Sequence, residues 1–202
     1  MYAKISKYLV YIAIVVVIVV SEINYYKLKG ILDSNKGVIE MVGMERDLLF
    51  DNIMLHYTYN ETKLFDVEVV NEDDSQQKLS ELFNDDYKLV FRFSYLHCSS
   101  CISSIFEELI KLSNDIPKDR FLIIGSYENK RAFLSFKKNH KISYPMYFVK
   151  EGTDKNKILE AENMPYFCLL NHDLVVQDLF IPLKEIPLYL KRYLKVIERK
   201  YF

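Results

Sequence analysis

Residues 8–20 read YLVYIAIVVVIVV and contain neither a charge nor a helix-breaking residue. Extending this run to Ile5 and Ile23 gives about 19 residues, or roughly 28 Å of helix, which is close to the hydrocarbon thickness of a bilayer. Tyrosines flank the run on both sides, as aromatic residues do at membrane interfaces. The sequence therefore predicts a transmembrane helix, and we assign residues 1–26 as an N-terminal membrane anchor.

Two alternatives remain for this segment. A cleaved secretory signal shares the basic start and the apolar core, although the sequence VVSEIN that follows is a poor cleavage site. A buried helix of a soluble protein is the other alternative. Lysines lie on both sides of the run, at positions 4, 7, 27 and 29, so the positive-inside rule only weakly favours a cytoplasmic N-terminus.

The composition of the whole chain limits what the remaining residues can do. Of the 202 residues, 50% are hydrophobic and 14% are aromatic, which is enough for a packed core. The net charge of −1 argues against a nucleic-acid-binding protein, which would carry a basic face. Three cysteines are too few for a disulfide-stapled scaffold, and one close pair plus one more fits a redox pair with a bystander.

Residues 27–61 are predicted to form a juxtamembrane helical spacer. Apolar residues recur at helix-like intervals from Ile31 to Ile53, although three glycines weaken the helix prediction. A helix that binds a partner is the alternative interpretation of this segment.

Residues 62–202 are predicted to form one α/β domain. Short apolar strands alternate with amphipathic helices, which indicates a sandwich with a central mixed sheet flanked by helices. Strands are expected at 64–70, 88–95, 120–127, 144–149, 164–171 and 174–181, a polar turn at 71–77, a helical turn at 78–83, and helices after residue 101 and at 129–140 and 184–200. The apolar stripes of the three helices are expected to contain Ile102, Ile105, Phe106, Leu109 and Ile110, then Ala132, Phe133 and Phe136, then Tyr189, Leu190, Tyr193, Leu194 and Ile197.

Cys98 and Cys101 follow the expected strand 88–95 in the sequence LHCSSC. Where a strand ends and a helix begins, unpaired backbone N–H groups and the helix dipole stabilise an anion, and the pKa of a cysteine there is lowered. Cys101 lies one helical turn later and faces the same way, so it can resolve a mixed disulfide. We predict that Cys98 is the exposed nucleophile and that Cys101 is the more buried resolving thiol, with the two serines between them tuning the reduction potential.

Other uses of this pair remain open, including a purely structural one. Zinc requires four ligands, and the sequence contains neither a second such pair nor a close histidine pair. A copper site would need His97 and the distant His172 beside the two thiolates. We predict no metal and no cofactor. Cys168 is interpreted as a buried small hydrophobic residue, His97 as an exposed neighbour, His172 as a solvated turn residue and Arg92 as a paired or snorkelling strand residue.

The order of strand, CxxC pair, amphipathic helix and a later X-Pro before a strand resembles the thioredoxin fold. More closely, it resembles the membrane-anchored TlpA/ResA-type and AhpC/TSA-like redoxins. The resemblance extends from about Leu64 to Ile197 and is carried by LVFRFSYLHCSSC, FLIIGSY and MPYFCLLNHDLVV. In that family the proline before the penultimate strand is cis and shapes the substrate cleft opposite the cysteines. Here this proline corresponds to Pro165, and Met164 precedes it.

Several positions depart from the family pattern. His97 stands where the family has Trp, and Ser99 and Ser100 occupy positions that often include Pro. Arg92 lies six residues before the first cysteine, where thioredoxins carry a buried Asp; a cation there favours a thiolate but cannot shuttle a proton as a carboxylate does. Tyr95 replaces the threonine of peroxiredoxins, so we do not expect peroxidase activity.

The resemblance implies a thiol–disulfide oxidoreductase that uses Cys98 and Cys101 on the thiols or disulfides of exported proteins. It also implies substrate contacts at His97, Met164 and Pro165 and a membrane protein that donates electrons. The expected location is the bacterial cytoplasmic membrane, crossed once, with the domain facing the periplasm or exterior. The alternative is a non-catalytic module that binds a partner in the same cleft; a copper-handling protein of the same fold is a further alternative.

Overall fold

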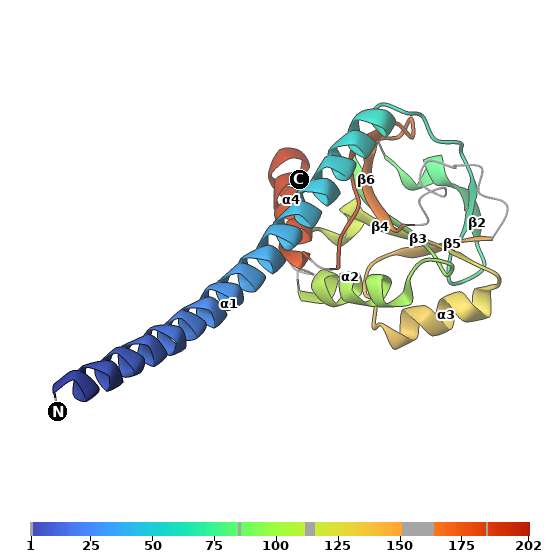
Figure 1. Ribbon diagram of the computed structural model, residues 1–202. Coiled ribbons are helices and arrows are strands. Elements are labelled where there is room, and N and C mark those ends of the chain that lie inside the picture. Colours follow the sequence, from blue (N-terminus) through green and yellow to red (C-terminus); the bar gives the residue numbers. More distant parts are fainter. Residues whose placement is uncertain (1, 85, 112–115, 151–163, 185) are drawn as a thin grey trace. The chain divides into compact units, whose positions relative to one another are not determined.

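The computed structural model describes residues 2–84, 86–111, 116–150, 164–184 and 186–202 (Figure 1). The side chains of residues 2–7, 9 and 10 lie outside this description, and so does residue 185 of the expected last helix. Residue contacts divide the chain into two compact units, Met1–Asp51 and Asn52–Phe202.

A single helix, α1 (Tyr2–Tyr59), contains both the apolar run and the expected spacer. Its three glycines do not interrupt it, and no atom outside the neighbouring backbone lies within 4 Å of the Cβ that any of them would gain. At 1.5 Å per residue, 58 residues extend over about 87 Å, which is far more than one bilayer crossing requires.

The unit Asn52–Phe202 contains a seven-stranded mixed sheet in the order β2-β1-β5-β4-β3-β6-β7. The neighbours β3, β4 and β5 are parallel, and the remaining pairs are antiparallel, which confirms the predicted mixed sheet. The strands are β1 (Glu68–Val70), β2 (Gln76–Lys78), β3 (Lys88–Ser94), β4 (Phe121–Tyr127), β5 (Met146–Lys150), β6 (Tyr166–Leu170) and β7 (Val176–Phe180). The other helices are α2 (Ser99–Lys111), α3 (Lys130–Asn139) and α4 (Pro187–Tyr201), with 3-10 turns at Leu79–Leu82 and Lys118–Arg120.

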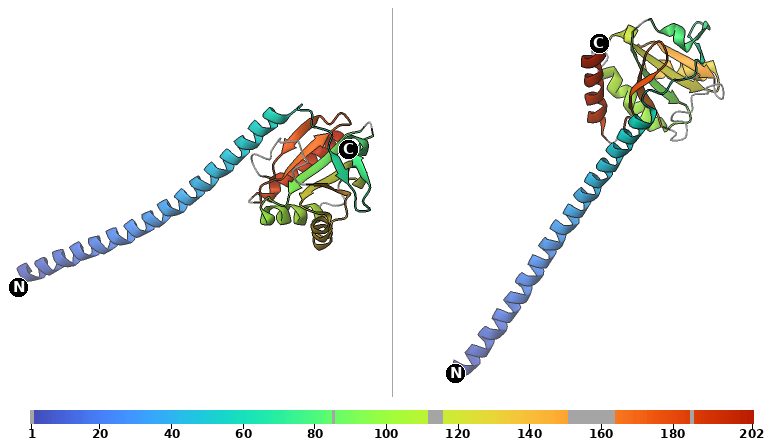
Figure 2. Two further views of the ribbon diagram at one scale, coloured as in Figure 1. Left: turned by 90° about the vertical axis from the view of Figure 1, so that its right-hand side faces the viewer. Right: turned by 90° about the horizontal axis from the view of Figure 1, so that it is seen from above.

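The first face of the sheet is covered by α2, α3 and α4. The crossovers from β3 to β4 and from β4 to β5 run in the same direction, so their right-handedness places α2 and α3 on the same face. Both views agree in showing these two helices on one side of the sheet (Figures 1 and 2). The core on this face is rich in aromatic rings and includes Phe91, Phe93, Phe106, Phe121, Phe133 and Phe167.

The second face of the sheet is covered by residues that precede β3. Leu64, Val67 and Leu79 pack there against Val90 of β3 and Cys168 of β6. Leu55 and Tyr59, in the last turns of α1, also pack against this cluster. The end of the long helix is therefore part of the folded domain.

The edge strand β7 is covered by the chain that leaves α1. The side-chain oxygen of Asn52 accepts the Ile181 N–H at 2.8 Å, and that of Asn60 accepts the Asp178 N–H at 3.3 Å. Backbone hydrogen bonds then join residues 61–64 to residues 174–176. Because an uncovered edge presents unpaired N–H and C=O groups, these contacts protect the sheet from pairing with another chain.

Some local predictions are wrong. The strand expected at 64–70 is limited to Glu68–Val70, because Leu64 and Val67 bury their side chains without joining a strand ladder. Gln76 and Gln77, expected in a turn, pair with β1 as part of β2. Ile110 is 50% exposed and Ala132 is also exposed, so each lies at the margin of the stripe to which it was assigned.

Candidate functional site

A tight turn at residues 94–97 connects β3 to the first cysteine. The Ser94 N–H donates to Nδ1 of His97 at 3.2 Å, and the His97 N–H donates to the Ser94 carbonyl at 3.0 Å. The Ser94 hydroxyl accepts the Leu96 N–H at 3.2 Å. In the turn that these hydrogen bonds hold together, His97 is buried and Leu96 is 58% exposed. The turn therefore brings the chain to the surface immediately before Cys98.

The expectation that His97 is exposed is wrong, since only 9% of the residue is accessible. Burial, together with the positive charge of Arg92, lowers the pKa of His97 to about 4. The imidazole is therefore neutral at pH 7, and its Nδ1 accepts the hydrogen bond that closes the turn.

Cys98 is exposed and directly precedes α2. Its carbonyl accepts the Ile102 N–H at 3.1 Å, the first hydrogen bond of the helix, and its Sγ lies 3.1 Å from the Ser100 hydroxyl. Hydrogen bonds from the Cys101 thiol, the Ser100 hydroxyl and the Cys101 backbone N–H lower the pKa of Cys98 to about 7, with a further contribution from the charge of Lys184. At pH 7 about half of such a thiol is thiolate, against about 3% of an ordinary cysteine.

Cys101 lies in the first turn of α2 and is partly buried. The predicted difference in exposure between the two cysteines is confirmed, and neither of them is in a disulfide in this structure. The arrangement combines an accessible, acidified thiol with a second thiol one helical turn away. This is the geometry that two-step thiol–disulfide exchange requires.

The effect of Lys184 on Cys98 was not predicted from the sequence. It is exposed, lies 86 positions after Cys98 in the segment between β7 and α4, and contributes the positive charge that acts on Cys98. No local pattern near the cysteines could have identified it, because the fold alone brings the two segments together.

Pro165 lies at the same end of the sheet as the cysteines. In the antiparallel pair of β3 and β6, Tyr166 is opposite Arg92, so the preceding proline is beside the end of β3 that leads to Cys98. Pro165 is buried, and Met164 is half-buried against the core of the second face. The topology thus brings Pro165 and the cysteine pair to one edge of the sheet.

The expected cis peptide bond before Pro165 is not present. No peptide bond among the described residues is cis, and the Met164–Pro165 bond is therefore trans. The trans form of an X-Pro bond is favoured by about 0.5–1 kcal/mol in the absence of contacts that select the other isomer.

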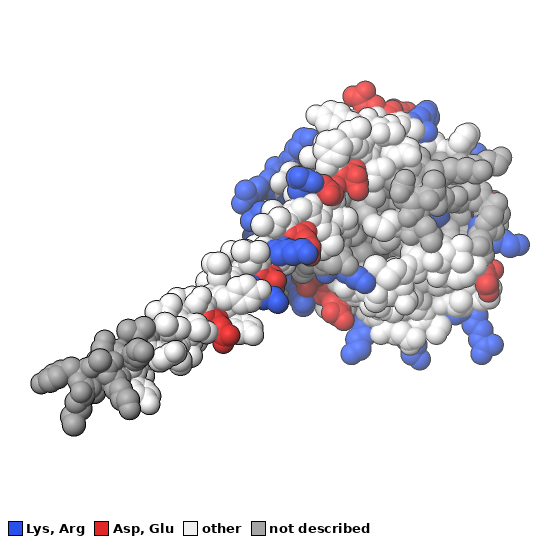
Figure 3. Space-filling view, viewed as in Figure 1, with Lys and Arg blue, Asp and Glu red and all other residues white. Residues whose placement is uncertain are grey.

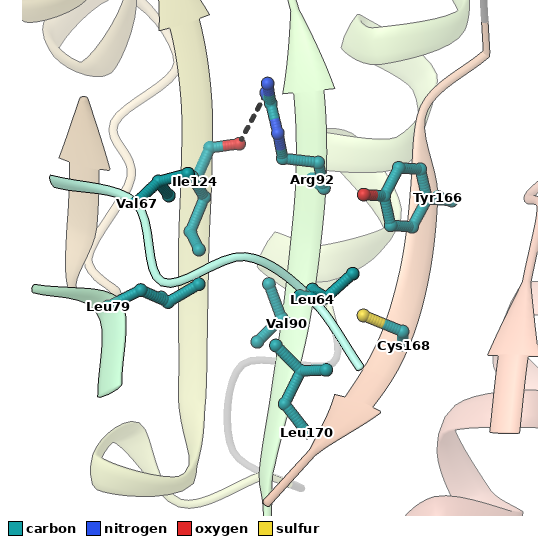
Figure 4. A pocket seen from close by; sticks show the side chains of 9 residues that line it. All are labelled: Leu64, Val67, Leu79, Val90, Arg92, Ile124, Tyr166, Cys168 and Leu170. Atoms are coloured by element: carbon teal, nitrogen blue, oxygen red, sulfur yellow. Dashed lines mark hydrogen bonds between the residues drawn. The ribbon is translucent and has the colours of Figure 1, made fainter. Parts of the chain in front are cut away.

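Arg92 is buried on the second face of the sheet. Its guanidinium donates to the carbonyls of Phe93 and Ile124 and, at 2.5 Å, to the Ser126 hydroxyl, which confirms that it is a paired strand residue. Figure 4 shows Arg92 with Tyr166 and Cys168 at a small cavity of about 20 Å³, room for about one water molecule. Its charge acts on His97, whereas the cation that acts on Cys98 is Lys184.

Cys168 and His172 do not form a metal-binding group with the cysteine pair. Cys168 is 1% exposed and burial raises its pKa to about 12, which confirms its interpretation as a hydrophobic residue. His172 is exposed in a turn, with Nε2 3.4 Å from the Asp173 carboxylate. In the part of the chain that the structure describes, no three His, Cys, Asp or Glu residues form a group that could hold a metal ion.

No protein-family model matches the chain, and no curated protein matches it. Among solved structures, it is similar to a candidate electron transfer protein from Aquifex aeolicus VF5, with a TM-score of 0.50, 18% identity and coverage of 68% of this chain and 93% of the other. It is also similar to peroxidoxin BcpB from Mycobacterium tuberculosis, with a TM-score of 0.50, 13% identity and coverage of 71% and 99%. The comparison shows a thioredoxin-like α/β fold.

Proposed function

We propose that this chain is a thiol–disulfide oxidoreductase that acts on exported proteins through Cys98 and Cys101. The observation that carries the proposal is the exposed thiol at the start of α2, whose pKa is lowered to about 7, with a second thiol one turn away. The thioredoxin-like fold supports it, because the pair stands at the strand-to-helix junction of that fold.

In the proposed reaction the Cys98 thiolate attacks one sulfur of a partner disulfide. A mixed disulfide forms, and the other partner sulfur leaves as a thiolate. The Cys101 thiolate then attacks Sγ of Cys98, which releases the second partner sulfur and leaves a Cys98–Cys101 disulfide. The partner gains two electrons and this chain loses two, so a membrane protein that donates two electrons must restore the dithiol.

The chain is further proposed to be tethered to the bacterial cytoplasmic membrane, with the domain facing the periplasm or exterior. By length and composition, α1 could cross a membrane, although a signal sequence passes the same test. The proposed division is an anchor at 1–26, a spacer at 27–61 and the redox domain at 62–202. The side of the domain that binds the partner is proposed to include Met164, Pro165 and His97. The proposed role of His97 is to support the turn that ends at Cys98.

The test is to trap the mixed disulfide. In the full chain, Cys101→Ser removes the resolving thiol, so partner proteins should accumulate as disulfides on Cys98 and be identified by mass spectrometry after non-reducing electrophoresis. The matched control is Cys98→Ser, which keeps Cys101 but removes the attacking thiol and should trap nothing. Equal trapping by both variants would exclude the proposed order of attack.

A non-catalytic binding module is the second candidate, and Arg92 favours it. This buried cation occupies the position where a thioredoxin has a carboxylate, so the chain does not have that proton shuttle there. Reduction of insulin disulfides by dithiothreitol-charged protein distinguishes the two candidates. Oxidoreductase activity requires turnover that Cys98→Ser abolishes, whereas a binding module shows no turnover in either form.

A further inference from the structure

The part of α1 before Asp51 carries an apolar stripe that is exposed to solvent. Its members are between 39% and 71% exposed, although each has a large aliphatic side chain. They are Leu28, Ile31, Leu32, Val38, Ile39, Val42 and Leu49. Large apolar side chains arranged on one side of an exposed helix mark a surface for another molecule.

The stripe repeats every seven residues. The first position of the heptad holds Leu28, Asn35, Val42 and Leu49, which follow one another at intervals of seven residues. The fourth position holds Ile31, Val38 and Glu45, and the fifth holds Leu32, Ile39 and Arg46. At 100° per residue, Gly30 and Gly37 fall almost opposite Leu28 and Asn35, so neither glycine interrupts the stripe. A period of seven is characteristic of helices that pack against other helices.

The charged residues of this segment argue against a lipid surface as the occupant. Residues 29–51 contain three basic and five acidic side chains, a net charge of −2. Most of them lie on the helix face opposite the stripe, where Lys36 and Glu40 form an ion pair at 4.0 Å. In Figure 3 charges of both signs interrupt the white part of the helix. Helices that lie on a bilayer carry a mainly basic polar face.

We propose that the stripe pairs with the same stripe of a second copy of this chain, as a parallel two-stranded coiled coil. The parallel direction rests on the membrane anchor proposed above, because two anchors in one bilayer orient both helices alike and raise their local concentration. Asn35 then meets its counterpart at the first heptad position, where a single buried Asn selects register and the two-stranded state. The contact places two redox domains on one paired stalk.

Disulfide cross-linking of the full chain in lipid nanodiscs tests the contact. In a Cys98→Ser/Cys101→Ser background, Val38→Cys places a thiol on the stripe and Glu40→Cys places one on the opposite face. Mild oxidation should convert Val38→Cys to a species of twice the 24.0 kDa chain mass and leave Glu40→Cys monomeric. Equal cross-linking at both positions, or none at position 38, would overturn the proposal.

A variant that inserts charges into the stripe tests the same contact without an engineered cysteine. The double substitution Val38→Glu/Val42→Glu places four carboxylates in the paired stripe, and the mass measured in detergent should change from dimer to monomer. The control Asp33→Asn/Glu40→Gln alters the polar face and should remain a dimer. A monomeric wild type, or a dimer that survives the double substitution, would refute the coiled coil. Alkylation of Cys98 in the same samples measures separately whether the proposed redox site is intact. Sedimentation with membranes measures separately whether the proposed anchor is inserted.

Discussion

Cys98 is exposed and its thiol has a lowered pKa, so the rate at which it reacts with an alkylating reagent should depend on pH. We expect the rate of its alkylation by iodoacetamide, followed by mass spectrometry of the peptide, to rise with a midpoint near pH 7. Ser100→Ala removes one of the hydrogen bonds that stabilise the thiolate, so the midpoint should move upward. Cys168 is the internal control and should not react while the protein is folded. A midpoint near that of a free cysteine would contradict the site described here.

His97 makes the stability of the fold depend on pH. Its pKa is about 4 in the folded protein against an ordinary 6.5, so the unfolded chain takes up a proton that the folded chain excludes. The stability linked to this residue is present above pH 6.5 and is lost as the pH falls towards 4. Between pH 7 and pH 5 this amounts to about 1–2 kcal/mol.

His97→Asn keeps a hydrogen-bond acceptor near the position of Nδ1 but does not titrate. Urea unfolding of this variant should lose less stability between pH 7 and pH 5 than the wild type does. His172→Asn changes an exposed histidine and should retain the wild-type dependence. An unaltered pH slope in His97→Asn would show that the imidazole is not buried in the neutral form.

At the scale of the elements, β4 depends on a glycine among aromatic rings. A Cβ on Gly125 would lie 3.0 Å from a ring carbon of Tyr127 and 3.1 Å from one of Phe93, and both rings are buried. Gly125→Ala is therefore expected to destabilise the domain by about 1–3 kcal/mol, measured by urea unfolding. Gly37→Ala is the control, because its Cβ meets no atom within 4 Å, and it should leave the domain transition unchanged.

A second element-scale feature is the β-bulge at Asp178. This residue has a φ of 47°, in the left-handed region, and interrupts the register between β6 and β7. Its carbonyl accepts the Tyr193 hydroxyl at 2.7 Å, and its carboxylate accepts Lys200 at 3.1 Å and the Tyr201 hydroxyl. The bulge thereby attaches α4 to the edge of the sheet, a role that no local sequence pattern indicates.

At the scale of the whole molecule, the last turns of α1 belong to the domain's core. A chain that begins at Asn52 retains Leu55, Tyr59 and the two asparagines that cover β7, whereas a chain that begins at Thr62 loses them. The shorter chain should be less stable by at least about 2 kcal/mol. For a domain of this size that corresponds to a thermal midpoint lower by about 4–8 °C. Equal midpoints by calorimetry would show that this end of α1 is only a tether.

The periodic patterns along the chain were sufficient to predict most elements and the position of the cysteine pair after β3. The apolar run at 88–94, interrupted by the single internal charge of Arg92, predicts a central strand, and the 3.6-residue period after Cys101 predicts the helix α2. These are local properties, since side-chain spacing selects the backbone that can bury those side chains. The exposed first thiol and the more buried second thiol follow from the same local geometry.

Tertiary structure decided the features that depend on residues distant in sequence. His97 is buried in the turn that its hydrogen bond with the Ser94 N–H closes. The charge of Lys184 acts on Cys98 only because of the path that the chain takes after β7. Strand β2 exists because β1 offers it a partner, although its own glutamines have little strand preference. The sequence alone therefore determined most of the helices and strands and the position of the exposed thiol, whose pKa is lowered mainly by its sequence neighbours Ser100 and Cys101. The burial of His97 and the charge of Lys184 near Cys98 depend instead on segments that only the folded chain brings together.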